Sequence, residues 1–86
     1  MGEYNDVILD FFTQQLLITR ASRGYSQQKM SEYLRVTPRS YFDLEHGICC
    51  VSARTLVFFL VILSDEEVLQ LVSKLREILN NPQSTA

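Results

Sequence analysis

The sequence predicts an all-α fold of five short helices. Apolar residues recur at helical spacing, and no stretch alternates apolar and polar residues for long enough to form a useful strand. The 86 residues correspond to a single domain, and three glycines, two prolines and several hydroxyl caps leave only short helices between them.

The first two helices are predicted from their ends. Residues 5–22 carry apolar side chains at roughly helical spacing, and Gly24 follows them, as glycine commonly does just past a helix. Ser26 is a good N-cap, because its hydroxyl accepts a backbone N–H that has no partner within the helix. We therefore expect a second helix over residues 27–34.

The other three helices have equally local signals. Thr37 caps a third helix. Pro38 holds its first position, where a missing N–H costs nothing, and the helix ends at Gly47. A serine opens a fourth helix over residues 52–63. Residues 64–67, with the sequence SDEE, match the capping box and start a fifth helix with an apolar stripe.

Charge is unevenly distributed along the chain. The formal net charge is −2, but between residues 20 and 54 six basic residues outnumber three acidic ones, which gives this segment a net charge of +3. Residues 1–19 carry −3 and the remainder carries −2. Because local charge sets the affinity for phosphates, the middle segment is the part suited to a nucleic acid.

Residues 26–47 are the most informative segment. Two short helices joined by a three-residue turn at residues 35–37 form a helix-turn-helix pattern. The segment resembles the helix-turn-helix of the Cro/phage-repressor (XRE) family, with matches at Gln27, Leu34, Val36, Glu45 and Gly47. Arg35 replaces the turn glycine of that family, which predicts a slightly strained or shifted turn.

The resemblance covers about residues 6–63 and implies a five-helix, lambda-repressor-like DNA-binding domain. On this basis residues 1–80 form one helix-turn-helix domain, in which residues 52–80 serve packing and dimerisation. Residues 81–86 are expected to form a flexible tail. The loop over residues 48–51 is uncharged, whereas the family usually has basic residues there.

The resemblance also implies roles for three residues. Gln27, at the start of the second helix, would bind a phosphate, which suits the free N–H groups and positive dipole end found there. Arg20 would pair with Glu45 and so tie the first helix to the end of the third.

The third helix is expected to enter the major groove with its N-terminal residues toward the bases. Arg39 is the best candidate for reading a base, because a guanidinium can bond O6 and N7 of guanine together. Phe42 would either contact a thymine methyl or be a partly packed aromatic, and Asp43 would either accept from cytosine or pair with Arg39 on the helix surface. The residues expected to contact DNA are Gln27, Lys29, Thr37, Pro38, Arg39, Ser40, Phe42, Asp43 and Arg23.

The run over residues 56–63, LVFFLVIL, predicts a helix that is apolar on every side and must therefore be covered on every side. We expect the fifth helix and a second protomer to share this task. A two-fold dimer also fits the way in which helix-turn-helix domains bind two half-sites. The residues expected at the dimer interface are Phe58, Val61, Ile62, Val68, Leu71, Val72 and Leu75.

Catalytic and metal chemistry are not expected. One histidine and no glycine-rich phosphate loop leave little from which to build a nucleophile and a base. Cys49 and Cys50 are adjacent, whereas structural zinc takes four ligands in separated pairs, so we predict neither metal nor cofactor. We expect the two cysteines to be small buried hydrophobes, and His46 to interact with the C-terminal dipole of its helix.

These observations together predict a sequence-specific protein that binds double-stranded DNA. It would be a bacterial or phage-type transcriptional regulator that acts as a homodimer on a pseudo-palindromic operator. Two alternatives are an antitoxin-type DNA-binding protein, whose apolar surface on the fourth and fifth helices binds a toxin or other protein, and an interaction module that has lost DNA binding. The lack of a signal peptide and of a long apolar run indicates a cytoplasmic protein with no membrane association.

Overall fold

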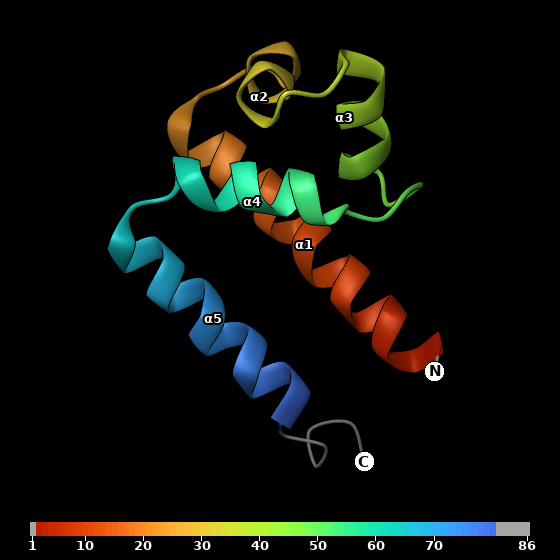
Figure 1. Ribbon diagram of the computed structural model, residues 1–86, viewed down its shortest axis with the longest axis vertical. Coiled ribbons are helices and arrows are strands. Elements are labelled where there is room, and N and C mark those ends of the chain that lie inside the picture. Colours follow the sequence, from red (N-terminus) through yellow and green to blue (C-terminus); the bar gives the residue numbers. More distant parts are fainter. Residues whose placement is uncertain (1, 81–86) are drawn as a thin grey trace.

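The computed structural model describes the backbone of residues 2–80 and the side chains of residues 7–80 (Figure 1). Within this part of the chain all regular structure is helical, which confirms the predicted all-α class. The helices are α1 (Gly2–Arg23), α2 (Gln27–Leu34), α3 (Pro38–Glu45), α4 (Ala53–Ile62) and α5 (Asp65–Asn80). The tail predicted at residues 81–86 lies outside the described residues.

The predicted caps explain where the helices begin. The hydroxyls of Ser26, Thr37 and Ser52 each accept the backbone N–H three residues further on, at 3.0, 3.1 and 3.2 Å. The capping box forms in both directions, because Ser64 Oγ accepts the N–H of Glu67 at 3.2 Å and Glu67 Oε1 accepts the N–H of Ser64 at 2.8 Å. Each such cap stabilises its helix by about 1 kcal/mol.

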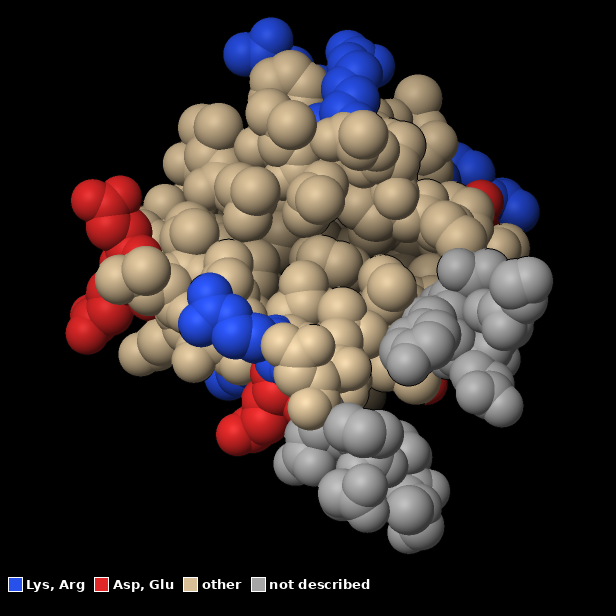
Figure 2. Space-filling view, turned by 60° about the horizontal axis from the view of Figure 1, so that its bottom comes forward, with Lys and Arg blue, Asp and Glu red and all other residues tan. Residues whose placement is uncertain are grey.

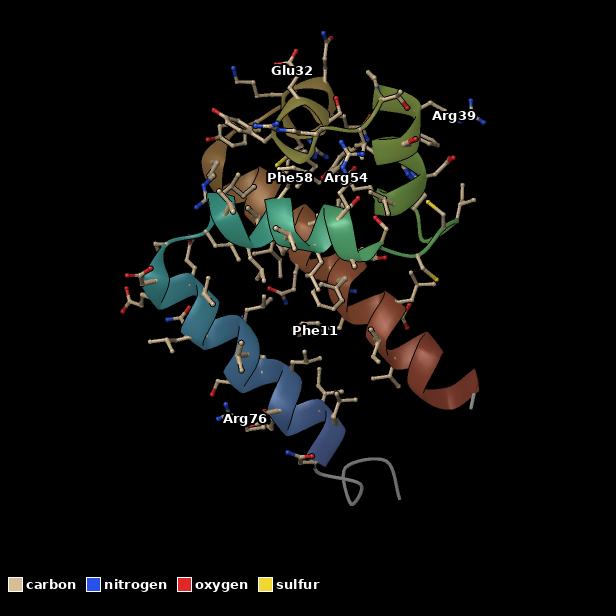
Figure 3. All side chains as sticks on the ribbon, in the orientation of Figure 1. Phe11, Glu32, Arg39, Arg54, Phe58 and Arg76 are labelled. Carbon is tan, nitrogen blue, oxygen red and sulfur yellow. The ribbon has the colours of Figure 1, made fainter. Side chains whose placement is uncertain are left out.

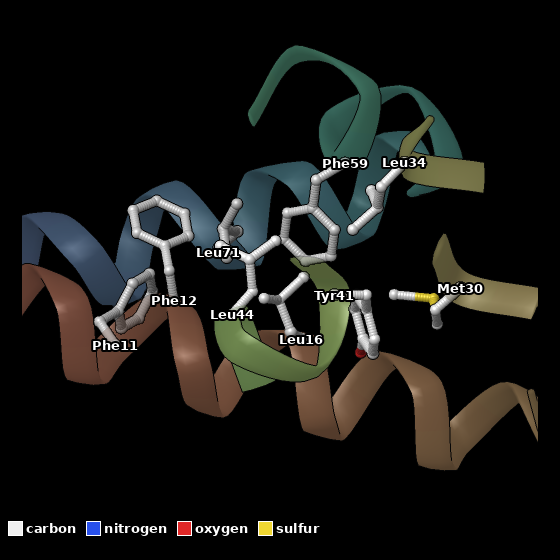
Figure 4. Packing of buried hydrophobic residues seen from close by; sticks show 9 residues of the cluster. All are labelled: Phe11, Phe12, Leu16, Met30, Leu34, Tyr41, Leu44, Phe59 and Leu71. Atoms are coloured by element: carbon white, nitrogen blue, oxygen red, sulfur yellow. The ribbon is translucent and has the colours of Figure 1, made fainter. Parts of the chain in front are cut away.

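The core forms where α1, α2, α3 and α4 meet, and α5 adds one buried side chain (Figure 4). Its centre is Phe59 of α4, which is 1% exposed. Burial of a side chain of this size contributes about 1.5–3 kcal/mol. The buried apolar residues are Phe11, Phe12, Leu16, Met30, Leu34, Tyr41, Leu44, Phe59 and Leu71.

The helices divide the molecule into two ends. The short helices α2 and α3 lie together beyond α4, whereas the second half of α5 and the first half of α1 extend to the opposite end (Figure 1). The molecule measures 38 × 28 × 21 Å along its principal axes. In the part of the chain that is described, no helix has the length and apolarity needed to span a membrane.

Two expectations about burial are wrong. Leu71, expected at a dimer interface, is 5% exposed and belongs to the core of its own chain, so it is not available to a partner. Cys49 and Cys50, expected to be buried, are both exposed free thiols. They lie in the loop between α3 and α4, outside the helical positions that face the core.

Candidate nucleic-acid interface

Helices α2 and α3 are joined by a tight turn at Arg35, Val36 and Thr37. Residues 27–45, from the start of α2 to the end of α3, are called here the α2–α3 unit. Arg35 has φ 60° and ψ 42°, a left-handed conformation that usually favours glycine. It is held there by hydrogen bonds from the N–H of Arg35 to the carbonyl of Glu32 at 3.2 Å and from the N–H of Val36 to that of Ser31 at 3.0 Å. The strained turn expected from the replaced glycine is therefore present.

Buried side chains fix the orientation of the two helices. Met30 and Leu34 of α2 are 0% and 1% exposed, and Tyr41 and Leu44 of α3 are 0% and 4% exposed. Because residues three and four apart lie on one helix face, Tyr41 and Leu44 define the inner face of α3. The opposite face of α3 is therefore left open to solvent.

A buried carboxylate ties the unit to α1. Glu45, at the end of α3, is 5% exposed and accepts hydrogen bonds from three side chains. Its partners are Arg20, which forms an ion pair, Gln27 Nε2 at 2.8 Å and the Tyr41 hydroxyl at 2.6 Å. The pair of Arg20 and Glu45 is thus present as expected, and it belongs to a larger network that the sequence did not indicate.

This network shifts the pKa values of its members. Burial by itself would raise the pKa of Glu45, but the hydrogen bonds from Arg20, Tyr41 and Gln27 outweigh burial and lower it. Burial, together with the bond to Glu45, raises the pKa of the Tyr41 hydroxyl. Glu45 is therefore a charged acceptor at neutral pH and Tyr41 a neutral donor.

The open face of α3 begins with polar side chains. Arg39 has a side chain that is 84% exposed, and its Nε lies 3.5 Å from a carboxylate oxygen of Asp43, one helical turn further on. The expected surface pairing of these two residues is therefore present. Thr37, Pro38 and Ser40 are also exposed, and the hydroxyls of Thr37 and Ser40 are 3.0 Å apart.

Phe42 lies on the same open face, where it stacks on His46. The two ring centres are 4.0 Å apart with an angle of 23° between the planes, and Phe42 remains 40% exposed. His46 is the C-cap of α3, and its Nδ1 lies 2.8 Å from the carbonyl oxygen of Phe42. This contact places the imidazole at the C-terminal end of the helix, as expected, and Phe42 remains partly accessible.

The residues predicted to anchor phosphates occupy different places. Lys29 is exposed on α2, with its ammonium 5.5 Å from the ring centre of Tyr33. Gln27 already donates one amide N–H to Glu45. Arg23 ends α1, and its guanidinium reaches the junction of α4 and α5, where it donates to Glu67 at 2.7 Å and to the carbonyl of Ile62 at 3.1 Å. Its guanidinium is therefore engaged inside the protein and away from α3.

The loop after α3 is exposed and uncharged. Ile48 is 66% exposed, and Cys49 and Cys50 follow it. Partial burial and the nearby Asp43 raise the pKa of the Cys49 thiol, which keeps it protonated at neutral pH. Within the described residues no three of the histidines, cysteines and carboxylates come together in a group that could hold a metal ion.

Several apolar side chains of α4 and α5 are exposed. Figure 2 shows that the middle of the side toward the chain ends carries few charged side chains. Of the predicted interface residues, Phe58, Ile62 and Leu75 pack in part on their own core, and Val68 is half-buried. The large apolar residues of α4 and α5 that are exposed are Val57, Val61, Leu69, Val72 and Ile78, and the first four are called here the α4–α5 patch.

Val57 and Leu69 were missed by the sequence reading. The run at residues 56–63 is apolar throughout, so its pattern does not show which side of α4 faces outward.

Comparison of the chain with family models, with curated proteins and with solved structures gives no match.

Proposed function

We propose that the chain binds double-stranded DNA through its α2–α3 unit. In this proposal the unit acts as a helix-turn-helix in a lambda-repressor-like domain, and α3 enters the major groove. The observation that carries the proposal is the open face of α3, with Arg39 exposed at its N-terminal turn. Its opposite face is held by Tyr41, Leu44 and Glu45, so the reading side chains stand on a rigid support.

Arg39 is suited to read a base. Its contact with Asp43 is a single exposed pair at 3.5 Å, and such helix-surface pairs contribute only about 0.3–0.5 kcal/mol. The guanidinium can therefore exchange Asp43 for the O6 and N7 acceptors of a guanine at low cost. After this exchange the Asp43 carboxylate is free to accept from a cytosine amino group, and the exposed part of Phe42 can contact a thymine methyl.

Contacts to phosphates hold the unit in register on the duplex. Lys29 supplies an exposed ammonium, and Gln27 has a second amide N–H at the start of α2, where the backbone N–H groups of the first turn also favour an anion. Arg23 is not included, because its guanidinium is bound to Glu67 and Ile62.

The α4–α5 patch supports a homodimer, which would place two α3 helices on two half-sites one DNA turn apart. The same exposed valines and leucine support a second candidate, in which the patch binds a different protein, as an antitoxin binds a toxin. The two candidates differ in what covers the patch and share the DNA-binding face.

The test is selection of bound fragments from a random DNA pool, followed by affinity measurements over a salt series. We expect the logarithm of affinity to fall linearly with the logarithm of salt concentration, because bound cations displace counterions from DNA. Lys29→Ala should reduce the slope by about 1, whereas Arg76→Ala, on α5 and far from α3, should leave it unchanged (Figure 3). A flat salt dependence, or no binding at low salt, would overturn the proposal.

A further inference from the structure

Two arginines from separate elements meet on one aromatic ring. The guanidinium carbon of Arg35, in the turn between α2 and α3, lies 4.8 Å from the ring centre of Phe58. That of Arg54, in the first turn of α4, lies 5.7 Å from the same ring centre. Both arginines are exposed, while Phe58 is half-buried and packs against the core. The three residues are called here the Arg35–Phe58–Arg54 cluster.

The cluster carries positive charge that the described residues do not neutralise. The ion pairs within this part of the chain use Arg20, Arg23 and Arg39, so neither Arg35 nor Arg54 is paired with a carboxylate. Glu32, on α2, lies on the far side of that helix from Phe58 (Figure 3). The two guanidinium carbons lie 4.8 and 5.7 Å from the same ring centre, so an anion that contacts both would be attracted by two cations that no carboxylate of the described residues neutralises.

The cluster is also positioned by the backbone. Arg35 occupies a left-handed conformation in which glycine would be free of strain, and its side chain is directed onto Phe58. Stacking on a ring limits the motion of a guanidinium and so lowers the entropy lost when it binds an anion. The site is separate from the open face of α3, since Phe58 and Arg54 lie where α4 faces α2, whereas Arg39 points away from the molecule (Figure 3).

We propose that the Arg35–Phe58–Arg54 cluster is a binding site for a phosphoryl group. Guanidinium groups match the oxygens of a phosphate in paired hydrogen bonds, and two of them can neutralise a doubly charged anion. The phosphoryl group has two possible sources, a phosphate of the DNA backbone or a phosphorylated small molecule. The site does not depend on the proposed reading of bases by α3.

The experiment is a titration of the protein with inorganic pyrophosphate, followed by NMR of the arginine Nε–H signals and the Phe58 ring. Sodium chloride at equal ionic strength is the control. We expect saturable shifts at Arg35, Arg54 and Phe58 with pyrophosphate alone. Arg35→Gly and Arg54→Gln should each weaken this binding at least tenfold, whereas Arg76→Gln should not change it. Arg35→Gly is suited to this test, because glycine adopts the required backbone without strain.

Binding that is unchanged in both variants, or shifts that do not saturate, would overturn the proposal. The source of the phosphoryl group follows from a second measurement on the same variants, the salt dependence of DNA affinity. A slope reduced by about 1 in Arg35→Gly assigns the site to the DNA backbone. An unchanged slope with loss of pyrophosphate binding assigns it to a small phosphorylated ligand. If the protein binds no DNA, the pyrophosphate titration still decides the proposal alone.

Discussion

The α2–α3 unit and the α4–α5 region place their polar and apolar groups in opposite ways. In the α2–α3 unit a carboxylate, Glu45, is buried and paired, and the outer face of α3 begins with polar side chains. α4 and α5 instead expose several apolar side chains among their polar ones, Val61 and Leu69 most of all, and α5 has a single buried side chain, Leu71. The comparison indicates that the buried contacts of the α2–α3 unit fix the position of its exposed polar groups. The α4–α5 region instead exposes apolar side chains that a partner could cover.

The largest effect should come from the core between these regions. Phe59→Ala removes the central side chain, and we expect a loss of about 4 kcal/mol in the free energy of unfolding. Leu71→Ala should cost less, about 2–3 kcal/mol, because truncation of leucine to alanine removes fewer buried carbon atoms than truncation of phenylalanine. Urea denaturation measures both, with Ile48→Ala, at a residue that is 66% exposed and lies outside the α4–α5 patch, as the control. Equal losses for Phe59 and Leu71 would show that α5 is as firmly packed as α4.

The second prediction concerns the hydrogen bonds and the ion pair around the buried Glu45 of the α2–α3 unit. Glu45→Gln removes the charge that Arg20, Tyr41 and Gln27 surround, and we expect a loss of about 3 kcal/mol. Because folding lowers the pKa of Glu45, its contribution is complete above the ordinary carboxyl pKa of 4.5 and is lost as the pH falls through the lowered value. Urea denaturation at a series of pH values measures how the free energy of unfolding depends on pH. In Glu45→Gln this dependence should be smaller than in the wild type. The exposed Glu32→Gln should be close to wild type at neutral pH.

A third prediction contrasts two exposed aliphatic residues. Val61, in the α4–α5 patch, is 73% exposed, and Ile48, in the loop after α3, is 66% exposed. If the patch forms a homodimer, Val61→Asp should weaken dimerisation at least tenfold, a loss of about 1.4 kcal/mol, whereas Ile48→Asp should not. Sedimentation velocity over a range of concentrations measures the effect. A wild-type protein that stays monomeric at high concentration would contradict the homodimer.

The smallest effect concerns the turn within the α2–α3 unit. Arg35→Gly and Arg35→Ala both remove the contact with Phe58, but only glycine relieves the left-handed conformation at φ 60°. We therefore expect the glycine variant to be more stable than the alanine variant by about 1 kcal/mol. Thermal and urea unfolding of the two proteins, measured side by side, test this difference. Equal stability would mean that the turn carries no strain.

The sequence predicted features set by neighbouring residues better than those set by distant ones. The starts of α2, α3 and α4 each depend on a cap three residues from its partner, so Ser26, Thr37 and Ser52 could be identified from local pattern alone. The pair of Arg20 and Glu45 is a distant contact, and it was predicted only through the family resemblance.

Other distant partners could not be predicted. Arg23 meets Glu67 across 44 residues, and Gln27 meets Glu45 across 18, and neither side chain carries a local signal for these contacts. The exposure of Cys49 and Cys50 was missed because residue type favours burial, whereas their place in a loop exposes them.

The most direct test compares two cations of the α2–α3 unit on the selected DNA site and on variants with one base pair changed. Arg39→Ala should remove about 1–3 kcal/mol of discrimination at one base pair, because it removes a base-reading group. Lys29→Ala should weaken binding to all the sequences alike, because a phosphate contact carries no base information. If Arg39→Ala keeps the full base preference of the wild type, α3 is not the reading helix.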